Sequence, residues 1–310
     1  MSSHTRAFLQ IHFCVVLWGF TAILGKLISL AALPLVWWRM VLVCGALLLV
    51  QRFWLGLRTL SPRLAMTYAG IGVVVALHWL TFYASIKLSN ASVAATCMAL
   101  TPVFISFVEP VLARRRFDAS ELLFGLAVIP GVMLVVGGTP DGMRLGIAVG
   151  ALSAFFVAIF ASLNKRFIAQ SEVLSVTGLE MGAGALFLTL SAPLLPAGEA
   201  LFVLPSNRDA VLLVALALGC TLLPFALSLV ALRQLSAFST ALAVNMEPVY
   251  AIVLAILLLG EQRELSLSFY AGVVIILVVV FAHPWMSRGK GDNDQGIGDR
   301  QRDREELRTF

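Results

Sequence analysis

Residues 89–116 read SNASVAATCMALTPVFISFVEPVLARRR, a long apolar run with prolines inside it and three arginines at its end. A second version of this stretch reads LSAFSTALAVNMEPVYAIVLAILLLGEQ over residues 235–262. The two segments align without gaps when one is shifted by 146 positions. The aligned pairs include Lys87 with Arg233, Ala91 with Ala237, Pro102 with Pro248, and Phe104 with Tyr250. The sequence therefore indicates an internal repeat, with two similar units along the chain.

The composition excludes a soluble globular domain. Hydrophobic residues make up 60% of the 310 positions and charged residues only 13%, whereas a soluble domain carries about a quarter charged residues. A helix needs roughly 20 apolar residues to cross about 30 Å of hydrocarbon. The backbone N–H and C=O groups of a helix form hydrogen bonds within the helix, which is necessary because the bilayer core contains no water. The alternating pattern of an outer-membrane barrel is absent, so the sequence predicts an all-α integral membrane protein.

Glycine and proline divide the apolar sequence into ten runs, each long enough for a transmembrane helix. We expect these helices over residues 7–30, 34–50, 64–86, 90–113, 119–136, 145–167, 174–195, 210–232, 236–259 and 267–285. The two similar segments fall in the fourth and ninth helices, which cross the membrane in opposite directions. The sequence therefore predicts two inverted five-helix repeats, 7–136 and 145–285, followed by a disordered cytoplasmic tail, 286–310.

The positions of lysine and arginine predict the orientation in the membrane. Basic residues gather in the loops that face the cytoplasm if the N-terminus is inside, such as Arg52, Arg58 and Arg114–Arg116. We therefore expect a multi-pass protein of the plasma membrane of bacterial type, with both termini in the cytoplasm. The net charge of +5 belongs to these loops and does not indicate a nucleic-acid partner. The sequence does not set the oligomeric state.

Two acidic residues inside predicted helices are candidates for ion coupling, because a charge at the bilayer centre costs at least about 2.5–3.5 kcal/mol. Glu247 lies roughly 16 Å into its helix at about 1.5 Å per residue, next to Pro248, which is expected to kink the helix. It is predicted to bind a proton or cation, or else to cap freed backbone groups. Glu180, flanked by glycines, is the second candidate; the alternative is an interhelical hydrogen bond.

Candidates for substrate binding lie on several helices. His78, Trp79 and Tyr83 share an aromatic face, which is either helix packing or a wall that stacks on a substrate. Arg39 either reaches the membrane interface or meets a substrate carboxylate in a cavity. The predicted binding residues are Trp18, Thr21, Arg39, His78, Trp79, Tyr83, Thr101, Asn245 and Tyr250.

Enzyme motifs are missing from the sequence. It contains no HExxH, GxSxG, Walker A or GxGxxG pattern, and the four cysteines have no metal-ligand spacing. We therefore expect no cofactor, no metal and no catalytic residue. Polar residues are scattered at several depths, which favours a transport path over a lipid-modifying active site or an assembly scaffold. Nothing repeats as the charged ring or carbonyl filter of a channel.

The chain resembles the drug/metabolite transporter superfamily, and its EamA-type members in particular, over about residues 11–285. The matching features are Trp18-Gly19, Arg39, Ser89–Ala91 before Pro102, Ser236-Ala237, Glu247-Pro248 and Gly260-Glu261. The resemblance implies ten helices in two inverted repeats and export of small metabolites such as amino acids, or of drugs, driven by an ion gradient. We expect a secondary transporter that works by alternating access, with amino acids or related metabolites as substrates. Efflux of cationic or multiple drugs is the alternative, because family membership does not select a substrate.

Overall fold

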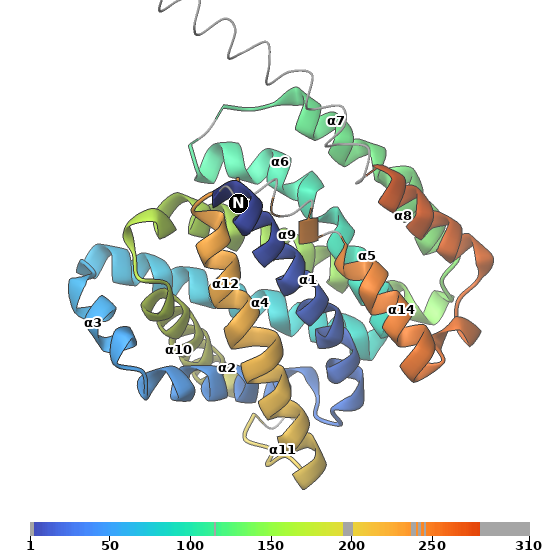
Figure 1. The fold of residues 1–310 in the computed structure, drawn as a ribbon. Coiled ribbons are helices and arrows are strands. Elements are labelled where there is room, and N and C mark those ends of the chain that lie inside the picture. Colours follow the sequence, from blue (N-terminus) through green and yellow to red (C-terminus); the bar gives the residue numbers. More distant parts are fainter. Residues whose placement is uncertain are drawn as a thin grey trace, which may run out of the picture.

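The computed structural model describes residues 3–114, 116–194, 201–236, 240, 243, 244 and 246–279. These residues form helices and connecting turns, with no β-strand among them. The predicted site residue Asn245, the tail 286–310, and parts of the last two predicted spans lie outside the described residues. Figure 1 shows the helices packed around one another, with α7 and α8 at the edge of the bundle.

The described helices follow the predicted apolar runs closely. The first half contains α1 (Ser3–Leu27), α2 (Ala32–Leu48), α3 (Gln51–Thr59), α4 (Pro62–Leu88), α5 (Ala91–Cys97), α6 (Thr101–Leu112), α7 (Ala119–Ala127) and α8 (Ile129–Gly137). The second half contains α9 (Arg144–Phe167), α10 (Val173–Ser191), α11 (Asn207–Val214), the π-helical segment η5 (Ala215–Leu222), α12 (Leu223–Leu232), α14 (Glu247–Leu259) and a final helix, Leu267–Val279.

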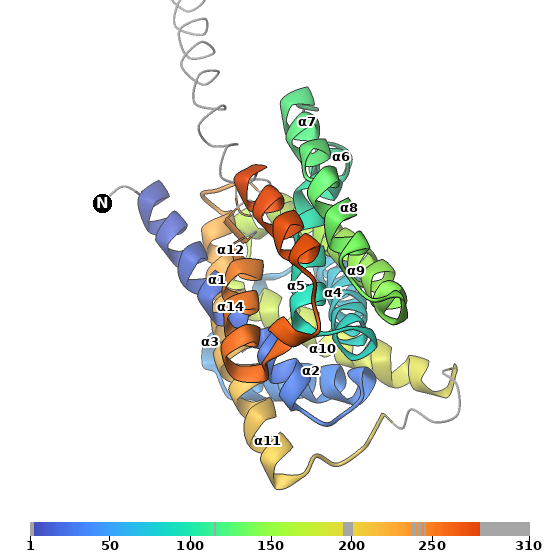
Figure 2. The same cartoon turned by 90° about the vertical axis from the view of Figure 1, so that its right-hand side faces the viewer.

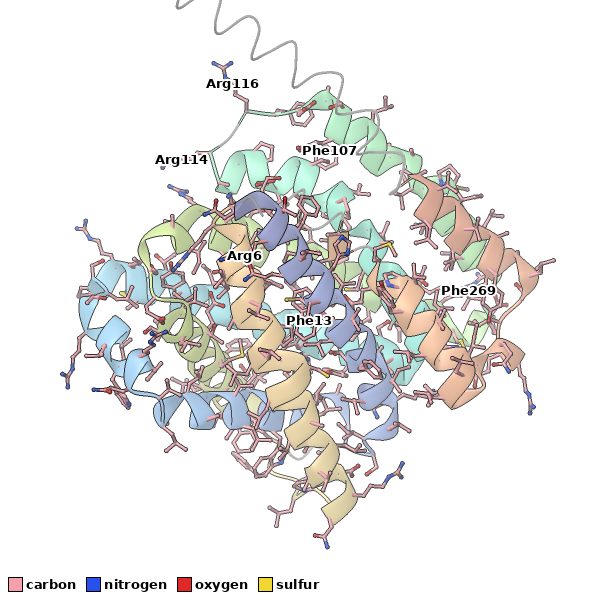
Figure 3. All side chains as sticks on the ribbon, in the orientation of Figure 1. Arg6, Phe13, Phe107, Arg114, Arg116 and Phe269 are labelled. Atoms are coloured by element: carbon pink, nitrogen blue, oxygen red, sulfur yellow. The ribbon has the colours of Figure 1, made fainter. Side chains whose placement is uncertain are left out.

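Seven helical segments among the described residues are long and apolar enough to cross a membrane. The bent pair α2 and α3 makes an eighth if it is counted as one span, while α14 and the final helix are shorter within the described range. Large apolar side chains such as Phe13 and Phe107 are about half exposed on the outside of the bundle (Figure 3). An apolar outer surface of this kind fits a lipid environment, so the chain is a multi-pass membrane protein. The number of ten spans stays a prediction.

Local sequence signals explain where the helices begin. Ser61 accepts a hydrogen bond from the Leu64 amide at 3.3 Å and is followed by Pro62, whose missing N–H costs nothing in a first helical turn. Asn90 caps α5 in the same way through the Val93 amide at 2.9 Å. These caps satisfy amides that have no partner within their own helix.

Several predicted spans are broken rather than continuous. The span predicted over 90–113 consists of α5, a single 3₁₀ turn at Met98–Leu100, and α6 with Pro102 at its start. The helix α14 begins at Glu247 itself, which places Pro248 in the first turn, where it opens the helix instead of kinking its middle. Glu247 therefore lies at a helix N-terminus, a position that favours negative charge.

The helix α3 differs from the sequence-based expectation, in which the residues between 50 and 64 form a loop. It follows α2 after a bend of 90°. Phe53 and Gly56 are buried, and Gly56 lies against the start of α10, whereas Trp54 and Arg52 are exposed. Its apolar residues recur at helical spacing over only two turns, a pattern too short to distinguish from a loop in the sequence.

The helix α4 lies at the centre of the bundle and packs against α9 and α10. The helix α1 packs against α12 and α14, as the two views show (Figures 1 and 2). Helices α4 and α10 approach closely at Gly72, where an added Cβ would lie 2.2 Å from the carbonyl oxygen of Glu180. Small residues permit such close contact between membrane helices.

A carboxylate joins the two halves of the chain. Glu261, which is only 1% exposed, accepts hydrogen bonds from the amides of Ala91 and Ser92 at 3.1 and 3.0 Å and from the Ser92 hydroxyl at 2.7 Å. A negative charge at the N-terminus of α5 also complements the helix dipole. The turn after α14 is thus bound to the start of α5 across the molecule.

Replacing Glu261 with alanine is expected to destabilise the protein by about 3 kcal/mol or more, because hydrogen bonds to a charged group contribute about 1.5–3 kcal/mol each and two buried amides would lose their partner. Thermal unfolding of the detergent-purified protein measures the loss. The control is Asp141→Ala, which removes only the exposed ion pair with Arg144, an interaction worth roughly 0–1 kcal/mol. Equal unfolding temperatures for the two variants would contradict this account.

Candidate functional site

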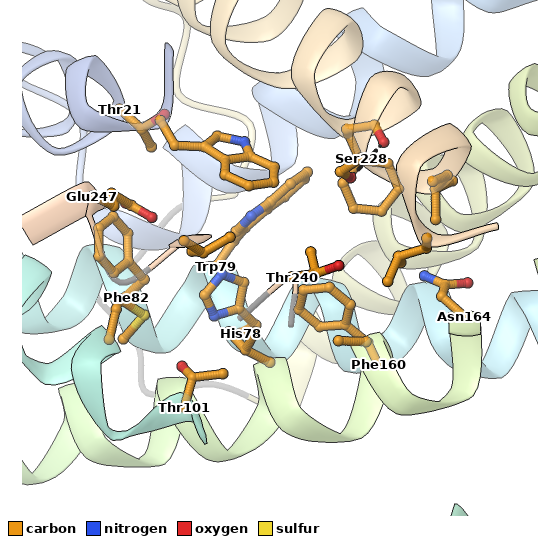
Figure 4. A pocket seen from close by; sticks show the side chains of 18 of the residues that line it. Thr21, His78, Trp79, Phe82, Thr101, Phe160, Asn164, Ser228, Thr240 and Glu247 are labelled. Atoms are coloured by element: carbon orange, nitrogen blue, oxygen red, sulfur yellow. Dashed lines mark hydrogen bonds between the residues drawn. The ribbon is translucent and has the colours of Figure 1, made fainter. Parts of the chain in front are cut away.

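One cavity lies between the two halves of the chain, with a volume of about 120 Å³. Figure 4 shows side chains from α1, α4, α9, α12 and α14 around it. Its lining residues are Trp18, Thr21, Arg39, His78, Trp79, Phe82, Met98, Thr101, Ile105, Val157, Phe160, Ala161, Asn164, Phe225, Ser228, Leu229, Leu232, Thr240, Val244 and Glu247. The wall is therefore mostly apolar and aromatic, with a few polar groups, as small-molecule sites usually are.

Arg39 is the cation of this site, and it is only 1% exposed. Its Nε donates to the Thr221 hydroxyl at 2.6 Å and its Nη1 donates to the Tyr83 hydroxyl at 2.9 Å. The guanidinium carbon lies 3.8 Å from the centroid of the Trp79 ring, a cation–π contact. A guanidinium carries five N–H donors, and no further hydrogen bond of Arg39 is found among the described residues, so the others are available to a solute.

The π-helical segment η5 supplies the partner that holds Arg39. Within η5, the Thr221 hydroxyl donates to the carbonyl of Leu216, five residues earlier, at 2.6 Å. That bond leaves the oxygen of Thr221 free to accept from Arg39. Such π-bulges are rare and occur frequently at functional sites. The sequence gives no clear sign of η5 except Pro224, which removes one backbone donor just beyond it.

Glu247 is the acid of the cavity and is 8% exposed. It lies in the electrostatic range of Arg39, although the two side chains form no ion pair within the described part of the chain. In Figure 4, Glu247 and Asn164 lie at opposite ends of the cavity. The site thus holds one positive and one negative group that face a common space without neutralising each other by direct contact.

His78 lines the cavity, and one of its ring nitrogens is hydrogen-bonded to another residue of the protein. Its Nδ1 lies 2.8 Å from the Ser153 hydroxyl and 3.2 Å from the Ser153 carbonyl, while that hydroxyl donates to the His78 carbonyl at 2.9 Å. The hydroxyl proton is therefore used, and Nδ1 must carry the proton of the neutral ring. This tautomer leaves Nε2 as a hydrogen-bond acceptor.

The aromatic face predicted on α4 continues onto two other helices. The Trp79 ring lies 6.3 Å from Phe225, and His78 lies 5.5 Å from Phe160, between ring centroids. Phe160 and Phe225 are 6.5 Å apart, which connects these rings along one wall. A continuous wall of rings provides apolar contact area for a flat or branched hydrophobic solute.

Three buried polar side chains of the cavity wall have side-chain atoms without a hydrogen-bond partner among the described residues. They are Thr21, Asn164 and Thr240, which are 5%, 1% and 8% exposed. Buried polar groups are nearly always paired in folded proteins, and unpaired ones call for a specific explanation. At a cavity wall, a bound solute or water supplies the missing partner.

The structure brings most, but not all, of the predicted site residues together. Trp18, Thr21, Arg39, His78, Trp79, Thr101 and Glu247 line the cavity. Tyr83 is fully buried behind the wall and holds Arg39. Tyr250 is 36% exposed on α14, next to Gly19 of α1, and does not line the cavity. Glu180 lies on α10 outside the cavity wall, and Asn245 is outside the described residues.

Sequence reasoning missed several lining residues of the second half, namely Phe160, Asn164, Phe225, Ser228 and Thr240. The amide of Asn164 was the detectable signal, since a polar residue inside an apolar helix is a candidate for function. Within the described ranges, no three histidine, cysteine, aspartate or glutamate side chains come together as a metal site.

A multi-pass helical bundle with a cavity of charged, polar and aromatic groups between its two halves is typical of a membrane transporter. The chain belongs to the EamA-like transporter family, whose model matches residues 5–137 and again residues 144–282. The two matches confirm the resemblance drawn from the sequence and the presence of two repeats. The protein is therefore a membrane transporter by family.

A solved crystal structure whose description names no function has the same fold. It superposes with a TM-score of 0.65 at 18% sequence identity, covering 92% of this chain and 98% of the other. At this identity the similarity establishes the fold alone. No curated protein matches the chain.

Proposed function

We propose that the protein is a secondary transporter that exports small zwitterionic, amphipathic metabolites, with amino acids as the main class. The observation that carries this proposal is the pairing of Arg39 and Glu247 in one small aromatic cavity. A zwitterion presents a carboxylate and an ammonium group a few ångströms apart. The cavity presents a guanidinium and a carboxylate without a direct ion pair between them, so each can bind the opposite group of the solute.

The remaining lining groups fit the rest of such a solute. The ring wall of Trp79, Phe160 and Phe225 accepts an apolar side chain. The unpartnered hydroxyls of Thr21 and Thr240 can bind polar atoms near the ammonium and carboxylate groups. The acceptor nitrogen of His78 adds a site for an ammonium or hydroxyl proton.

The size of the cavity favours amino acids over drugs. Its volume is about 120 Å³, and a cavity of about 150 Å³ in another protein binds benzene. Drug-sized ligands occupy pockets of roughly 300–1,000 Å³. In this conformation the site therefore fits a solute of about the size of a small or medium amino acid. The presence of Arg39 also disfavours a cationic solute.

Transport would proceed by alternating access between two inverted repeats of five helices each. The two family matches, one for each half, support this arrangement, and substrate sites between such repeats lie near the membrane midplane. We place the protein in the bacterial inner membrane with both termini in the cytoplasm. In support, Arg6, Arg114 and Arg116 lie toward the same end of the molecule (Figure 3). A C-terminal reporter that fluoresces only in the cytoplasm tests this orientation.

A thermal-shift screen of the purified protein tests the substrate class. Amino acids, sugars and cationic drugs are added separately, and a ligand of the folded state raises the apparent stability, by about 2.7 kcal/mol at a hundredfold excess over Kd. Stabilisation by leucine or phenylalanine supports the proposal. Stabilisation by cationic drugs alone would replace it with multidrug efflux. A hit is then assayed for counterflow exchange in vesicles, and a ligand that binds without being exchanged would contradict transport.

Replacing Glu247 with glutamine is expected to abolish gradient-driven amino-acid uptake into vesicles while expression and folding are retained. The amide keeps the size of the side chain but removes the charge that pairs with the ammonium group and that Arg39 attracts. Counterflow exchange should fall with it, since binding is lost. The matched control is Asp141→Asn, an acid exposed far from the cavity. Undiminished uptake by the Glu247→Gln variant would exclude Glu247 from the mechanism.

A further inference from the structure

Glu180 on α10 is a buried acid that the substrate site does not use. It is fully buried, and neither of its carboxylate oxygens has a hydrogen-bond partner among the described residues. The side-chain amide of Asn164 lies within hydrogen-bonding reach of it, but the two groups form no well-aligned hydrogen bond. An ionised carboxylate in such surroundings is costly unless it is paired. The arrangement is therefore that of a carboxyl group carrying a proton.

The backbone around Glu180 explains why it has no partner there. Helices α4 and α10 touch at Gly72, and a Cβ on Gly72 would lie 2.2 Å from the Glu180 carbonyl oxygen. A Cβ on Gly184 of α10 would lie 2.8 Å from the Gly72 carbonyl oxygen. This close contact holds Glu180 against α4 and leaves little room for a compensating side chain. On its other side, Asn164 forms part of the cavity wall.

A row of polar groups leads from Glu180 away from the cavity. Tyr68 of α4 is fully buried and lies within electrostatic range of Glu180. Its hydroxyl donates to the hydroxyl of Ser171 at 2.8 Å. Ser171 lies in the turn between α9 and α10, and its carbonyl accepts a hydrogen bond from Arg233. Ser171, Tyr68, Glu180 and Asn164 thus form a row of polar groups between the loop end of these helices and the cavity, in which Tyr68 and Glu180 are within electrostatic range but form no hydrogen bond.

The ionisable groups on the packed elements do not neutralise Glu180. Tyr68 of α4 lies within electrostatic range of Glu180, and Arg233 after α12 lies within electrostatic range of Tyr68. Cys44 of α2 lies against Gly182, two residues along α10. Lys165 donates to the carbonyls of Leu232 and Leu235, and Arg233 donates to Ser171. The arginines of α3, Arg52 and Arg58, are exposed. Glu247, by contrast, has Arg39 nearby.

We propose that Glu180 is the proton-binding site that couples transport, and that Tyr68 and Ser171 connect it to cytoplasmic water. This inference rests on the proposed function. When the cavity faces outside, the Glu180 carboxylate takes one proton from water that enters from the cavity beside Asn164 and becomes a neutral acid. When the cavity faces inside, that proton passes through a water molecule to the Tyr68 hydroxyl, which gives its own proton to the Ser171 hydroxyl, and Ser171 in turn gives one to cytoplasmic water. One proton enters for each solute exported, and Glu247 binds the solute.

The first test needs no substrate. Infrared difference spectra of the reconstituted full-length protein, wild type minus Glu180→Gln, are expected to show the carbonyl band of a protonated carboxylic acid. The control Glu109→Gln removes another buried acid, which lies near Lys165 and outside the cavity wall, and it should keep the Glu180 band. Absence of this band from the wild-type difference spectrum overturns the proposal.

The second test separates coupling from transport itself, with radiolabelled leucine as the probe. Glu180→Gln is expected to lose accumulation driven by a pH gradient while it keeps counterflow exchange, and Glu109→Gln should keep the wild-type ratio of the two. Driven accumulation that survives in Glu180→Gln overturns the proposal. If the wild-type protein exchanges no amino acid at all, the proposed function fails, and the infrared result still decides the protonation of Glu180.

A tyrosine variant tests the proposal if Glu180→Gln loses both gradient-driven accumulation and counterflow exchange. Tyr68→Phe removes only the hydroxyl that donates to Ser171 and lies within electrostatic range of Glu180, so gradient-driven uptake should slow while counterflow is unchanged. Its control is Tyr270→Phe, which removes a hydroxyl that has no hydrogen-bond partner among the described residues and lies on the final helix, outside the cavity wall. Gradient-driven uptake that is equal in both tyrosine variants overturns the route through Tyr68.

Discussion

Replacing Arg39 with methionine is expected to abolish amino-acid transport and the thermal stabilisation of the protein by amino acids. Arg39 is the one lysine or arginine among the described residues that line the cavity, and its guanidinium is fixed by Thr221, Tyr83 and Trp79. A solute carboxylate would bind to the N–H groups that these contacts leave available. Counterflow exchange in vesicles and thermal shift with the same amino acid measure the two losses.

The same change should also destabilise the folded protein. A buried charge is costly when the opposite charge that attracts it is removed. Here the remaining charge is Glu247, whose electrostatic partner is Arg39. A double variant, Arg39→Met with Glu247→Gln, removes both charges and should recover much of the lost stability without recovering transport. This pattern distinguishes the loss of a binding group from general misfolding.

Two further variants sharpen the test of Arg39. Lysine at this position keeps the charge but loses the planar fork that binds Thr221 and Tyr83 together, so transport should be strongly reduced. The control Lys26→Met removes an exposed basic side chain at the end of α1 and should leave transport unchanged. Transport by Arg39→Met at the wild-type rate would exclude a carboxylate site at Arg39.

The sequence predicts the residues of the first half of the site better than those of the second half. Arg39 and Glu247 could be selected because charge is costly in a bilayer, wherever their helices lie. Ser228 could not, because its hydroxyl donates to the Phe225 carbonyl of its own helix, and a hydroxyl that can be satisfied in this way gives little indication of function in the sequence. When every face of a helix is apolar, the sequence does not indicate which face packs against the neighbouring helices. For this reason the sequence predicts Tyr250 in the cavity, although Tyr250 does not line it.

The fold, like the site, is predicted only in part by the sequence. Apolar length and the repeat around Pro102 and Pro248 predict helices and their order, and the family matches confirm the two repeats. The break at Met98–Leu100 and the π-helical segment η5 depend on how neighbouring helices pack. A single proline indicates that a break is possible but not which hydrogen bonds replace the lost one. These irregular segments nevertheless position Thr101 and Thr221 at or next to the site.

Gly72→Ala is expected to destabilise the protein strongly, whereas Gly70→Ala, two residues away on α4, is expected to be neutral or stabilising. A Cβ at position 72 would lie 2.2 Å from the carbonyl oxygen and 2.7 Å from the Cα of Glu180, and backbone atoms cannot turn aside as a side chain can. Overpacking typically costs about 1–3 kcal/mol, and a backbone clash belongs at the upper end or beyond. At position 70 the added Cβ meets no atom within 4 Å.

Which of the two variants is less stable decides the interpretation, because both replace glycine with alanine in the same helix. Alanine favours a helix over glycine by about 1 kcal/mol, so only close packing can make Gly72→Ala the less stable variant. Thermal unfolding in detergent compares the two, and equal stability would mean that α4 and α10 do not touch at Gly72. Since that contact also holds Glu180 beside Asn164, any Gly72→Ala protein that folds should lose gradient-driven uptake before it loses counterflow exchange.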